Sequence, residues 1–288
     1  MRVGVPKEIK NNEFRVGMTP GAVREYAMHR HKVMVETEAG LGIKASDEDY
    51  KNAGATIAPD AKTVFAENDM IVKVKEPQPV EYAQLRDGQI LYTYLHLAPD
   101  PEQTKGLIKS GVTGVAYETV TDDFGGLPLL APMSEVAGRL AIQAGAYALT
   151  APQGGRGLLM GGVPGVLPAK VLVIGGGVVG THAAKMAIGL GAEVTILDRN
   201  LRRLAYLDDI FGGRVKTRYS TFEALDEETD GADVVIGAVL IPGASAPKLV
   251  TREMLKGMKQ GAVLVDVSID QGGCFRNLQS HHPRRTDL

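Results

Sequence analysis

The sequence predicts an α/β protein with two domains, each built on a largely parallel sheet that helices cover on both faces. Short apolar runs of strand length alternate with amphipathic stretches from residue 3 to about residue 267. A glycine-rich stretch with a proline-containing connection divides this pattern near its middle. A chain of 288 residues is long enough for two domains, each with its own core.

The first domain is expected over residues 1–130. Strands are predicted at Val3–Val5, Val33–Val35, Met70–Val74, Ile90–Leu95 and Val112–Tyr117. Helical patterns fall between them, for example at Pro20–Met28, Ala61–Ala66 and Pro101–Lys109. Alternation of this kind is typical of a doubly wound parallel sheet.

A connection between domains is predicted at Thr121–Pro132, which contains Gly125-Gly126-Leu127-Pro128. A helix is then expected to open at Ser134-Glu135, because apolar residues recur after it at helical spacing.

The second domain is expected over residues 131–275, including this connector helix. Its predicted strands are Val171–Ile174, Val194–Leu197, Asp233–Val239 and Ala262–Val267, with helices at Val179–Leu190 and Arg202–Ile210.

A dinucleotide fingerprint lies at the start of this second unit. Residues 175–180 read Gly-Gly-Gly-Val-Val-Gly, which matches G-x-G-x-x-G directly after a strand and at the opening of a helix. Gly175 permits a tight turn, Gly177 lets the backbone approach a pyrophosphate, and Gly180 allows close packing of helix on strand. The second domain is therefore predicted to be a Rossmann domain.

The cofactor is predicted to be NAD. Asp198 ends the next strand, where a carboxylate accepts hydrogen bonds from the ribose hydroxyls and repels the 2′-phosphate of NADP. Arg199 beside it is able to accommodate that phosphate, which keeps NADP as the alternative. Ser134 is interpreted as either a helix N-cap or a cofactor contact. Further cofactor contacts are placed at Val178, Val179, Arg203, Ser220, Val239 and Leu240.

Composition narrows the function classes. Lys+Arg number 32 against 34 Asp+Glu, so no basic field favours nucleic acid or an anionic membrane. No apolar run reaches the roughly 18 residues of a membrane span, and the N-terminus has no signal core, so a cytoplasmic protein is expected. Cys274 is the single cysteine, and no His/Cys cluster has the spacing of a metal site.

Four polar residues near predicted strand ends of the two domains are the candidates for chemistry: Arg15, Lys75, His96 and Asp270. A guanidinium binds a carboxylate with two parallel hydrogen bonds, and a lysine polarises a carbonyl. Histidine, with an unperturbed pKa of about 6.5, suits proton transfer. Taken alone, Arg15 and Lys75 are better interpreted as surface cations, as most Arg and Lys are, and Asp270 can be interpreted as a turn or cap residue.

At these residues the sequence resembles the alanine dehydrogenases, which form one family with the transhydrogenase α chain. The resemblance rests on motifs from residue 1 to about 275, among them Val5-Pro6-Lys7-Glu8, Glu13-Phe14-Arg15-Val16, Lys75-Glu76-Pro77, Tyr94-Leu95-His96-Leu97-Ala98, Pro132-Met133-Ser134-Glu135 and Ser268-Ile269-Asp270-Gln271-Gly272.

The resemblance implies the roles of the four residues. Arg15 and Lys75 match substrate-binding positions, His96 matches the acid/base, and Asp270 matches a carboxylate beside substrate and nicotinamide. The implied reaction is reversible, NAD-dependent oxidative deamination of L-alanine to pyruvate and ammonia, in a homo-oligomer that is a hexamer in the family. Two alternatives stay open: a transhydrogenase α-type subunit, and an NAD-binding protein without catalytic activity.

After Phe275 the resemblance is expected to stop. Residues 276–288 are polar and aperiodic, whereas family members continue further. With one permitted choice of codons, removal of a single nucleotide at codon 276 converts the tail to Glu-Thr-Ser-Ser-Arg-Thr-Thr-His-Ala-Glu-Pro-Thr, which looks like the family sequence. A frameshift that replaced the last segment is therefore our hypothesis, and impaired activity is its expected consequence.

Overall fold

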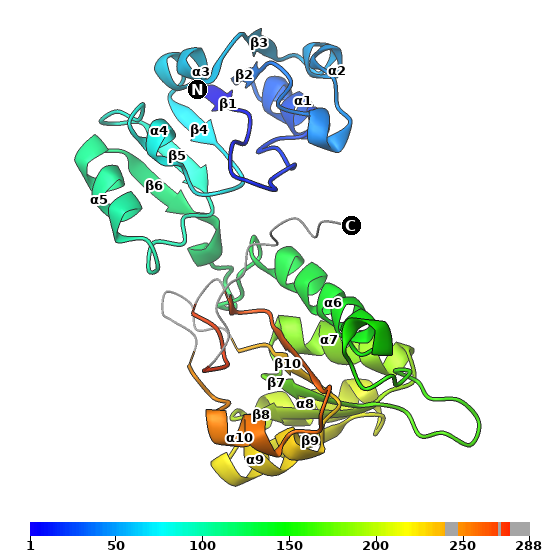
Figure 1. The fold of residues 1–288 in the computed structure, drawn as a ribbon. Helices are drawn as coiled ribbons and strands as arrows, with labels where there is room; N and C mark the ends of the chain where they lie inside the picture. Colours follow the sequence, from blue (N-terminus) through cyan, green and yellow to red (C-terminus); the bar gives the residue numbers. More distant parts are fainter. Residues whose placement is uncertain (240–246, 270–271, 277–288) are drawn as a thin grey trace. The chain divides into compact units, whose positions relative to one another are not determined.

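The computed structural model describes residues 1–239, 247–269 and 272–276. Contacts divide the chain into two compact units, Met1–Leu129 and a second unit that begins at Leu130. Each is an α/β unit with one parallel sheet (Figure 1), which confirms the predicted fold class. Asp270 and Leu240, which the sequence predicts to be site residues, lie outside the described residues.

The first unit is built on a six-stranded sheet. Its strand order is β3-β2-β1-β4-β5-β6, and every neighbouring pair is parallel. The strands are β1 (Arg2–Val5), β2 (Lys32–Glu36), β3 (Thr56–Ala58), β4 (Met70–Val72), β5 (Ile90–Thr93) and β6 (Thr113–Ala116). Because β1 lies between β2 and β4, the strand order reverses there, which is the feature that creates a ligand crevice in doubly wound sheets.

Five helices and two 3₁₀ turns accompany this sheet: α1 (Pro20–Met28), η1 (Leu41–Ile43), α2 (Asp47–Asn52), α3 (Ala61–Glu67), α4 (Pro79–Tyr82), α5 (Pro101–Ser110) and η2 (Tyr117–Thr119). The local sequence determines where several of these helices begin or end. Thr19, Asp60 and Asp100 each accept a backbone hydrogen bond as N-cap residues, and Gly111 ends α5 at φ +71°.

Two apolar clusters lie on the first sheet. One contains Val3, Val5, Val33 and Val35 with side chains of α1 and α2. The other contains Ile71 and Leu91 with side chains of α3 and α5. Since neighbouring residues of a strand point to opposite faces, strands buried in this way read as continuous apolar runs.

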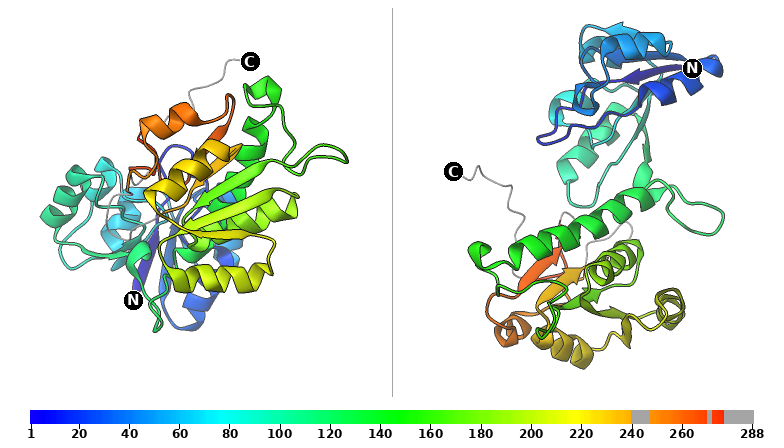
Figure 2. Two further views of the ribbon diagram at one scale, coloured as in Figure 1. Left: turned by 90° about the horizontal axis from the view of Figure 1, so that it is seen from below. Right: turned by 90° about the vertical axis from the view of Figure 1, so that its right-hand side faces the viewer.

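The second unit has a five-stranded parallel sheet in the order β11-β10-β7-β8-β9. The strands are β7 (Lys170–Ile174), β8 (Glu193–Asp198), β9 (Lys216–Tyr219), β10 (Val234–Gly237) and β11 (Val263–Asp266). The helices are α6 (Ala131–Ala148), α7 (Val178–Gly189), α8 (Leu201–Phe211), α9 (Phe222–Gly231) and α10 (Arg252–Gly257), with a 3₁₀ turn η3 (Ala151–Gln153). Figure 2 shows the helices on both sides of this sheet. Here the strand order reverses between β7 and β10.

The connector helix begins earlier than the sequence predicts. Helix α6 starts at Ala131, and Leu130 is its N-cap, so Ser134 lies inside the helix with its N–H donating to the carbonyl of Leu130. The N-cap interpretation of Ser134 is therefore wrong. The start of α6 was predicted too late because of Pro132, since proline interrupts a helix in most sequence contexts. In the first turn of a helix, however, its missing N–H costs nothing.

Gly138 explains why α6 packs tightly on α7. A Cβ at this position would overlap the carbonyl oxygen of Val179, and Gly138 is buried in the helix. None of the helices in the described part of the chain combines the length and apolar character that a membrane crossing needs.

Candidate active site

The first unit gathers charged side chains at the carboxyl ends of its central strands. Residues 6–19 follow β1 and residues 73–78 follow β4, on the two sides of the point where strand order reverses. Arg15 and Lys75 lie in these two segments, and His96 lies three residues after β5. The topology thus brings all three to one edge of the sheet, the edge where open α/β sheets bind ligands.

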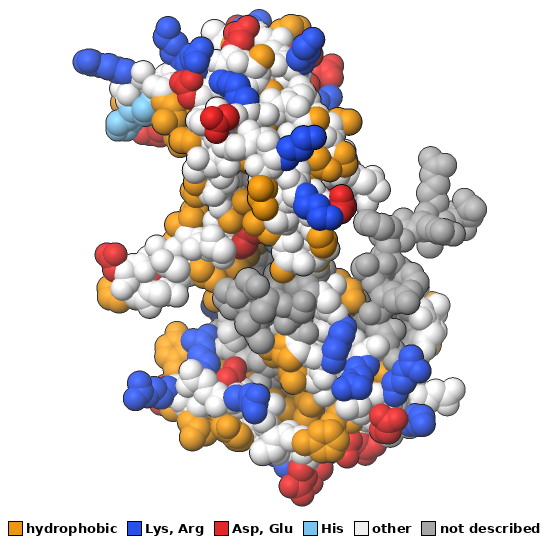
Figure 3. All heavy atoms as spheres, turned by 90° about the vertical axis from the view of Figure 1, so that its left-hand side faces the viewer, with side chains coloured by type: hydrophobic (Ala, Val, Ile, Leu, Met, Phe, Trp, Pro, Cys, Tyr) orange, Lys and Arg blue, Asp and Glu red, His pale blue; other side chains and the backbone are white. Residues whose placement is uncertain are grey.

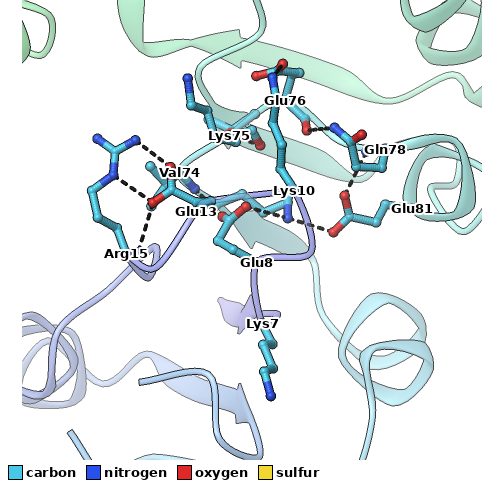
Figure 4. A network of polar contacts seen from close by, with 12 residues as sticks. Lys7, Glu8, Lys10, Glu13, Arg15, Val74, Lys75, Glu76, Gln78 and Glu81 are labelled. Atoms are coloured by element: carbon cyan, nitrogen blue, oxygen red, sulfur yellow. Dashed lines mark hydrogen bonds and ion pairs between the residues drawn. The ribbon is translucent and has the colours of Figure 1, made fainter. Parts of the chain in front are cut away.

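Arg15 is held by a carboxylate of its own segment. Its Nε donates to Glu13 Oε1 at 2.8 Å, its Nη2 donates to Glu13 Oε2 at 2.5 Å, and its backbone N–H donates to Oε1 at 2.8 Å. The Glu13 side chain is only 6% exposed, while that of Arg15 is 45% exposed. Figure 4 shows the two side chains with Lys75 beside them.

The charge of Glu13 is fixed by its neighbours. Burial alone raises the pKa of Glu13, but the hydrogen bonds from Arg15 and the charges of Arg15 and Lys75 outweigh it, so the pKa lies below its usual value. The same pairing raises the pKa of Arg15. Glu13 and Arg15 are therefore both charged at neutral pH.

The segment after β4 is anchored by a buried lysine. The Nζ of Lys73 is 3.1 Å from Glu8 Oε2 and 2.6 Å from Glu81 Oε1, and the Lys73 side chain is fully buried. Glu8 Oε1 also accepts from the N–H of Val74 at 2.6 Å. Since Glu8 follows β1, this carboxylate ties the two segments together (Figure 4).

Lys75 itself is half-buried, and its carbonyl accepts a hydrogen bond from Thr93 Oγ1 at 2.9 Å. The strand predicted at Met70–Val74 ends at Val72 in the structure, so Lys75 lies three residues beyond β4. Backbone hydrogen bonds to the neighbouring strand continue beyond β4, since the N–H of Lys73 donates to the carbonyl of Tyr92 and the N–H of Tyr94 donates to the carbonyl of Val74.

His96 has an unusual backbone conformation. Its φ is +46°, in the left-handed region that non-glycine residues rarely occupy. The carboxylate of Glu118, in η2, accepts from the N–H of His96 at 2.7 Å and from the N–H of Leu95 at 3.0 Å. The imidazole stacks on the ring of Tyr94 at 6.0 Å between centroids. Strain of this kind at a titratable residue is typical of functional sites.

The second unit carries the dinucleotide fingerprint at the carboxyl end of β7. Gly175 has φ +101°, and a Cβ there would lie 2.8 Å from the carbonyl oxygen of Ala238. A Cβ at Gly180 would overlap the carbonyl oxygen of Gly175. At Gly177, the N-cap of α7, a Cβ would meet nothing within 4 Å. The turn therefore has open space only where a pyrophosphate needs close approach to the helix N-terminus.

Asp198 lies next to this turn. Its Oδ2 accepts from the N–H of Gly176 at 2.7 Å, and its Oδ1 accepts from the N–H of Asn200 at 2.8 Å. Arg203 contacts the same turn. Its Nε donates to the carbonyl of Gly176 at 2.5 Å, and its Nη2 donates to Thr181 Oγ1 at 2.7 Å.

The remaining predicted cofactor contacts lie in the same unit. Val178 and Val179 open α7, and the N–H of Ser220, just after β9, donates to the carbonyl of Asp198. Val239 follows β10, and its carbonyl accepts from Ser268 Oγ at 2.7 Å. Ser134 lies in the first turns of α6. In the described part of the chain, no three His, Cys, Asp or Glu side chains come together as metal ligands.

Surface charge shows no dominant sign on the face drawn in Figure 3. Lysine and arginine side chains are interspersed there with acidic and apolar ones.

Sequence profiles of a known family match both units. The profile described as alanine dehydrogenase/PNT, N-terminal domain, matches residues 4–137, and the corresponding C-terminal domain profile matches residues 141–287. The chain belongs to the alanine dehydrogenase/PNT family. The second match includes most of residues 276–288, which the sequence analysis sets apart as a tail.

Individual members of this family agree with the assignment. The alanine dehydrogenase of Halomonas elongata is 58% identical over 275 residues, which are 96% of this chain and 74% of that protein. A solved L-alanine dehydrogenase superposes with a TM-score of 0.91 at 52% identity, covering 98% of this chain and 78% of the other. The transhydrogenase of Sinorhizobium meliloti superposes at 0.78 with 30% identity, covering 97% and 82%. The chain thus spans about three quarters of the length of its relatives.

The sequence analysis did not predict the part that three residues have in the site: Glu13, Lys73 and Glu118. Glu13 stands two residues before Arg15, a spacing that offers a usable signal for an ion pair. Lys73 and Glu118 offer none, because their partners lie 8, 65 and 22 or 23 residues away in sequence.

Proposed function

We propose that this member of the alanine dehydrogenase/PNT family is an L-alanine dehydrogenase, which converts L-alanine to pyruvate and ammonia reversibly with NAD. The observation that carries the proposal is the gathering of Arg15, Lys75 and His96 at one sheet edge of the first unit. A carboxylate-binding guanidinium, a carbonyl-polarising ammonium and a proton-transfer group are the three functions that a 2-oxo acid requires.

The proposed roles rest on the family resemblance and on the chemistry of each side chain. Arg15 binds the substrate carboxylate, since a guanidinium donates parallel hydrogen bonds to a carboxylate and the Arg15 side chain is 45% exposed. Lys75 polarises the carbonyl oxygen at C2. His96 donates a proton to the oxygen that leaves as water when pyruvate is aminated, and takes it back in the direction of deamination.

We assign residues 1–130 as the substrate domain and 131–275 as the NAD domain. The open space at Gly177 and the N-terminus of α7 suit the pyrophosphate, and Asp198 suits the ribose hydroxyls. Bound NAD supplies the acceptor for the hydride that leaves C2 of alanine. Ser134, Val178, Val179, Arg203, Ser220, Val239 and Leu240 complete the proposed cofactor site.

Asp270 is proposed as a carboxylate beside the substrate, on the family resemblance alone. On the same ground we propose a homo-oligomer and a cytoplasmic location. The likeness to a transhydrogenase supports a second candidate, a subunit that passes hydride to a partner. The higher identity to alanine dehydrogenases favours the first candidate.

The test is oxidation of L-alanine with NAD or NADP, followed by detection of pyruvate and ammonia. The proposal expects both products with NAD, at a rate well above that with NADP because of Asp198. Reduction of a nicotinamide analogue by NADH without any 2-oxo acid, and no turnover of alanine, would instead support the transhydrogenase-type subunit.

A further inference from the structure

Glu13 has no part in the roles assigned above, yet it accepts three hydrogen bonds from Arg15, the residue proposed to bind the substrate carboxylate. Its two carboxylate oxygens take the Nε and Nη2 donors of Arg15, and Oε1 also takes the Arg15 backbone N–H. A bidentate pair of this kind fixes the plane and direction of a guanidinium. Glu13 therefore sets how Arg15 is presented.

The charge of Glu13 matters as much as its geometry. Arg15 and Lys75 are two cations, and the charges of both lower the pKa of Glu13, which places all three groups within one electrostatic neighbourhood. Glu13 offsets one of the two positive charges. The part of the site formed by these three residues then has one net positive charge, which matches one substrate carboxylate.

Other acidic side chains nearby are already engaged. Glu8 lies in the field of Arg15, but its oxygens hold the Nζ of Lys73 and the N–H of Val74. Glu76 pairs with Lys10, and Glu81 pairs with Lys73. Glu13, by contrast, pairs directly with Arg15.

We propose that Glu13 is a specificity-determining residue, which restricts the site to 2-oxo acids with a single carboxylate by neutralising one of the cations Arg15 and Lys75. This inference rests on the proposed function, because it assumes that the same site binds a 2-oxo acid. A substrate with a second carboxylate meets the charge of Glu13 without a free cation to balance it. At an effective dielectric constant of about 20, a charge interaction of this kind changes affinity by tenfold or more.

The test compares two ligands of similar shape. Oxaloacetate has a second carboxylate where 4-methyl-2-oxopentanoate has an uncharged branched end. Dissociation constants for both ligands and for pyruvate are measured by ligand-observed NMR with the full chain, and folding of each variant is checked by thermal melting. For Glu13→Gln, which keeps size and loses charge, we expect affinity for oxaloacetate relative to 4-methyl-2-oxopentanoate to rise about tenfold.

Two further variants separate charge from shape. Glu13→Asp keeps the charge but shortens the side chain, so it is expected to weaken pyruvate binding while the ratio of the two ligands stays at the original value. Glu38→Gln removes a carboxylate that pairs with Lys7 at 3.1 Å on the surface of the same unit, and is expected to change nothing.

The outcomes are distinguishable. If pyruvate binds and the ratio is unchanged in a folded Glu13→Gln variant, the inference about Glu13 is wrong and the proposed function stands. If Glu13→Asp shifts the ratio as much as Glu13→Gln, the effect is one of geometry, and the charge argument is overturned. If none of the three 2-oxo acids binds the unsubstituted protein, both proposals are contradicted.

Discussion

The carboxylate of Glu118 accepts a hydrogen bond from the backbone N–H of His96 at 2.7 Å, and His96 has a φ of +46°. Glu118 follows β6, whereas His96 follows β5, so the contact joins the ends of two neighbouring strands. A left-handed conformation costs a non-glycine residue about 1 kcal/mol or more. Glu118 therefore holds the candidate acid/base in a conformation that the chain alone does not favour.

Replacing Glu118 is predicted to slow chemistry more than binding. In Glu118→Ala, two backbone N–H groups lose a charged acceptor, which costs about 1–3 kcal/mol, and His96 loses its support. We expect kcat for pyruvate amination to fall by about tenfold or more with little change in KM. Glu118→Gln keeps one acceptor oxygen and is expected to retain more activity than the alanine variant. Steady-state kinetics check this, and a rise in KM at constant kcat would contradict it.

Two glycines of the fingerprint are predicted to respond differently to alanine. At Gly177 a Cβ meets nothing within 4 Å, so Gly177→Ala is expected to fold normally and to weaken NADH binding. At Gly180 a Cβ overlaps the carbonyl oxygen of Gly175, so Gly180→Ala is expected to lower the melting temperature as well. Thermal melting with and without NADH distinguishes the two. Equal melting temperatures for both variants would refute the assignment of separate roles.

Asp198 is predicted to select NAD over NADP. Asp198→Asn removes the negative charge that repels a 2′-phosphate but keeps an acceptor for the N–H of Gly176. We expect NADPH affinity to rise relative to NADH by about tenfold, measured as the ratio of dissociation constants. Arg199→Ala serves as the control. If its effect on NADPH binding equals that of Asp198→Asn but in the opposite direction, the cofactor preference is shared by the two residues.

Lys73 is predicted to be structural. Lys73→Met leaves Glu8 and Glu81 buried without their cation, which is expected to destabilise the first unit by about 3 kcal/mol in chemical denaturation. Lys105→Met, which breaks an exposed ion pair with Glu102, is the control and is expected to change stability by less than about 1 kcal/mol.

The effect of pH on the stability of the Lys73→Met variant follows from Glu81. Burial raises the pKa of Glu81 above its ordinary value near 4.5, despite the opposing charge of Lys73. The folded state then binds the proton more tightly than the unfolded state, so the contribution of Glu81 to stability is present below pH 4.5 and is lost as pH rises. The deficit of Lys73→Met is expected to shrink between about pH 7 and about pH 5, and a constant deficit would argue against buried charge as its cause.

The fold could be predicted from the sequence wherever a strand is buried on both faces. Runs such as Val171–Ile174 are apolar throughout, and the structure places β7 there. Strand β9, whose sequence is Lys-Thr-Arg-Tyr, has no such pattern, because it lies at the edge of its sheet. Helices α9 and α10 were not predicted either; both are short and bury few apolar side chains, Ala224 and Leu225 in α9 and Met254 in α10.

The site is predictable to a smaller extent. The glycine fingerprint has a fixed spacing, so its geometry can be anticipated residue by residue. Glu118 cannot be linked to His96 from sequence, because the contact depends on the pairing of β5 with β6. The ion pairs of Lys73 likewise depend on strand order, which places the segments after β1 and β4 side by side.

The most direct test of the account is NADH oxidation with pyruvate and ammonia by the unsubstituted chain and by Arg15→Ala, with NADH binding measured for both. We expect turnover that yields L-alanine in the unsubstituted protein and its loss in Arg15→Ala, while both proteins bind NADH equally. Turnover that survives Arg15→Ala, or NADH binding without any turnover in the unsubstituted protein, would contradict it.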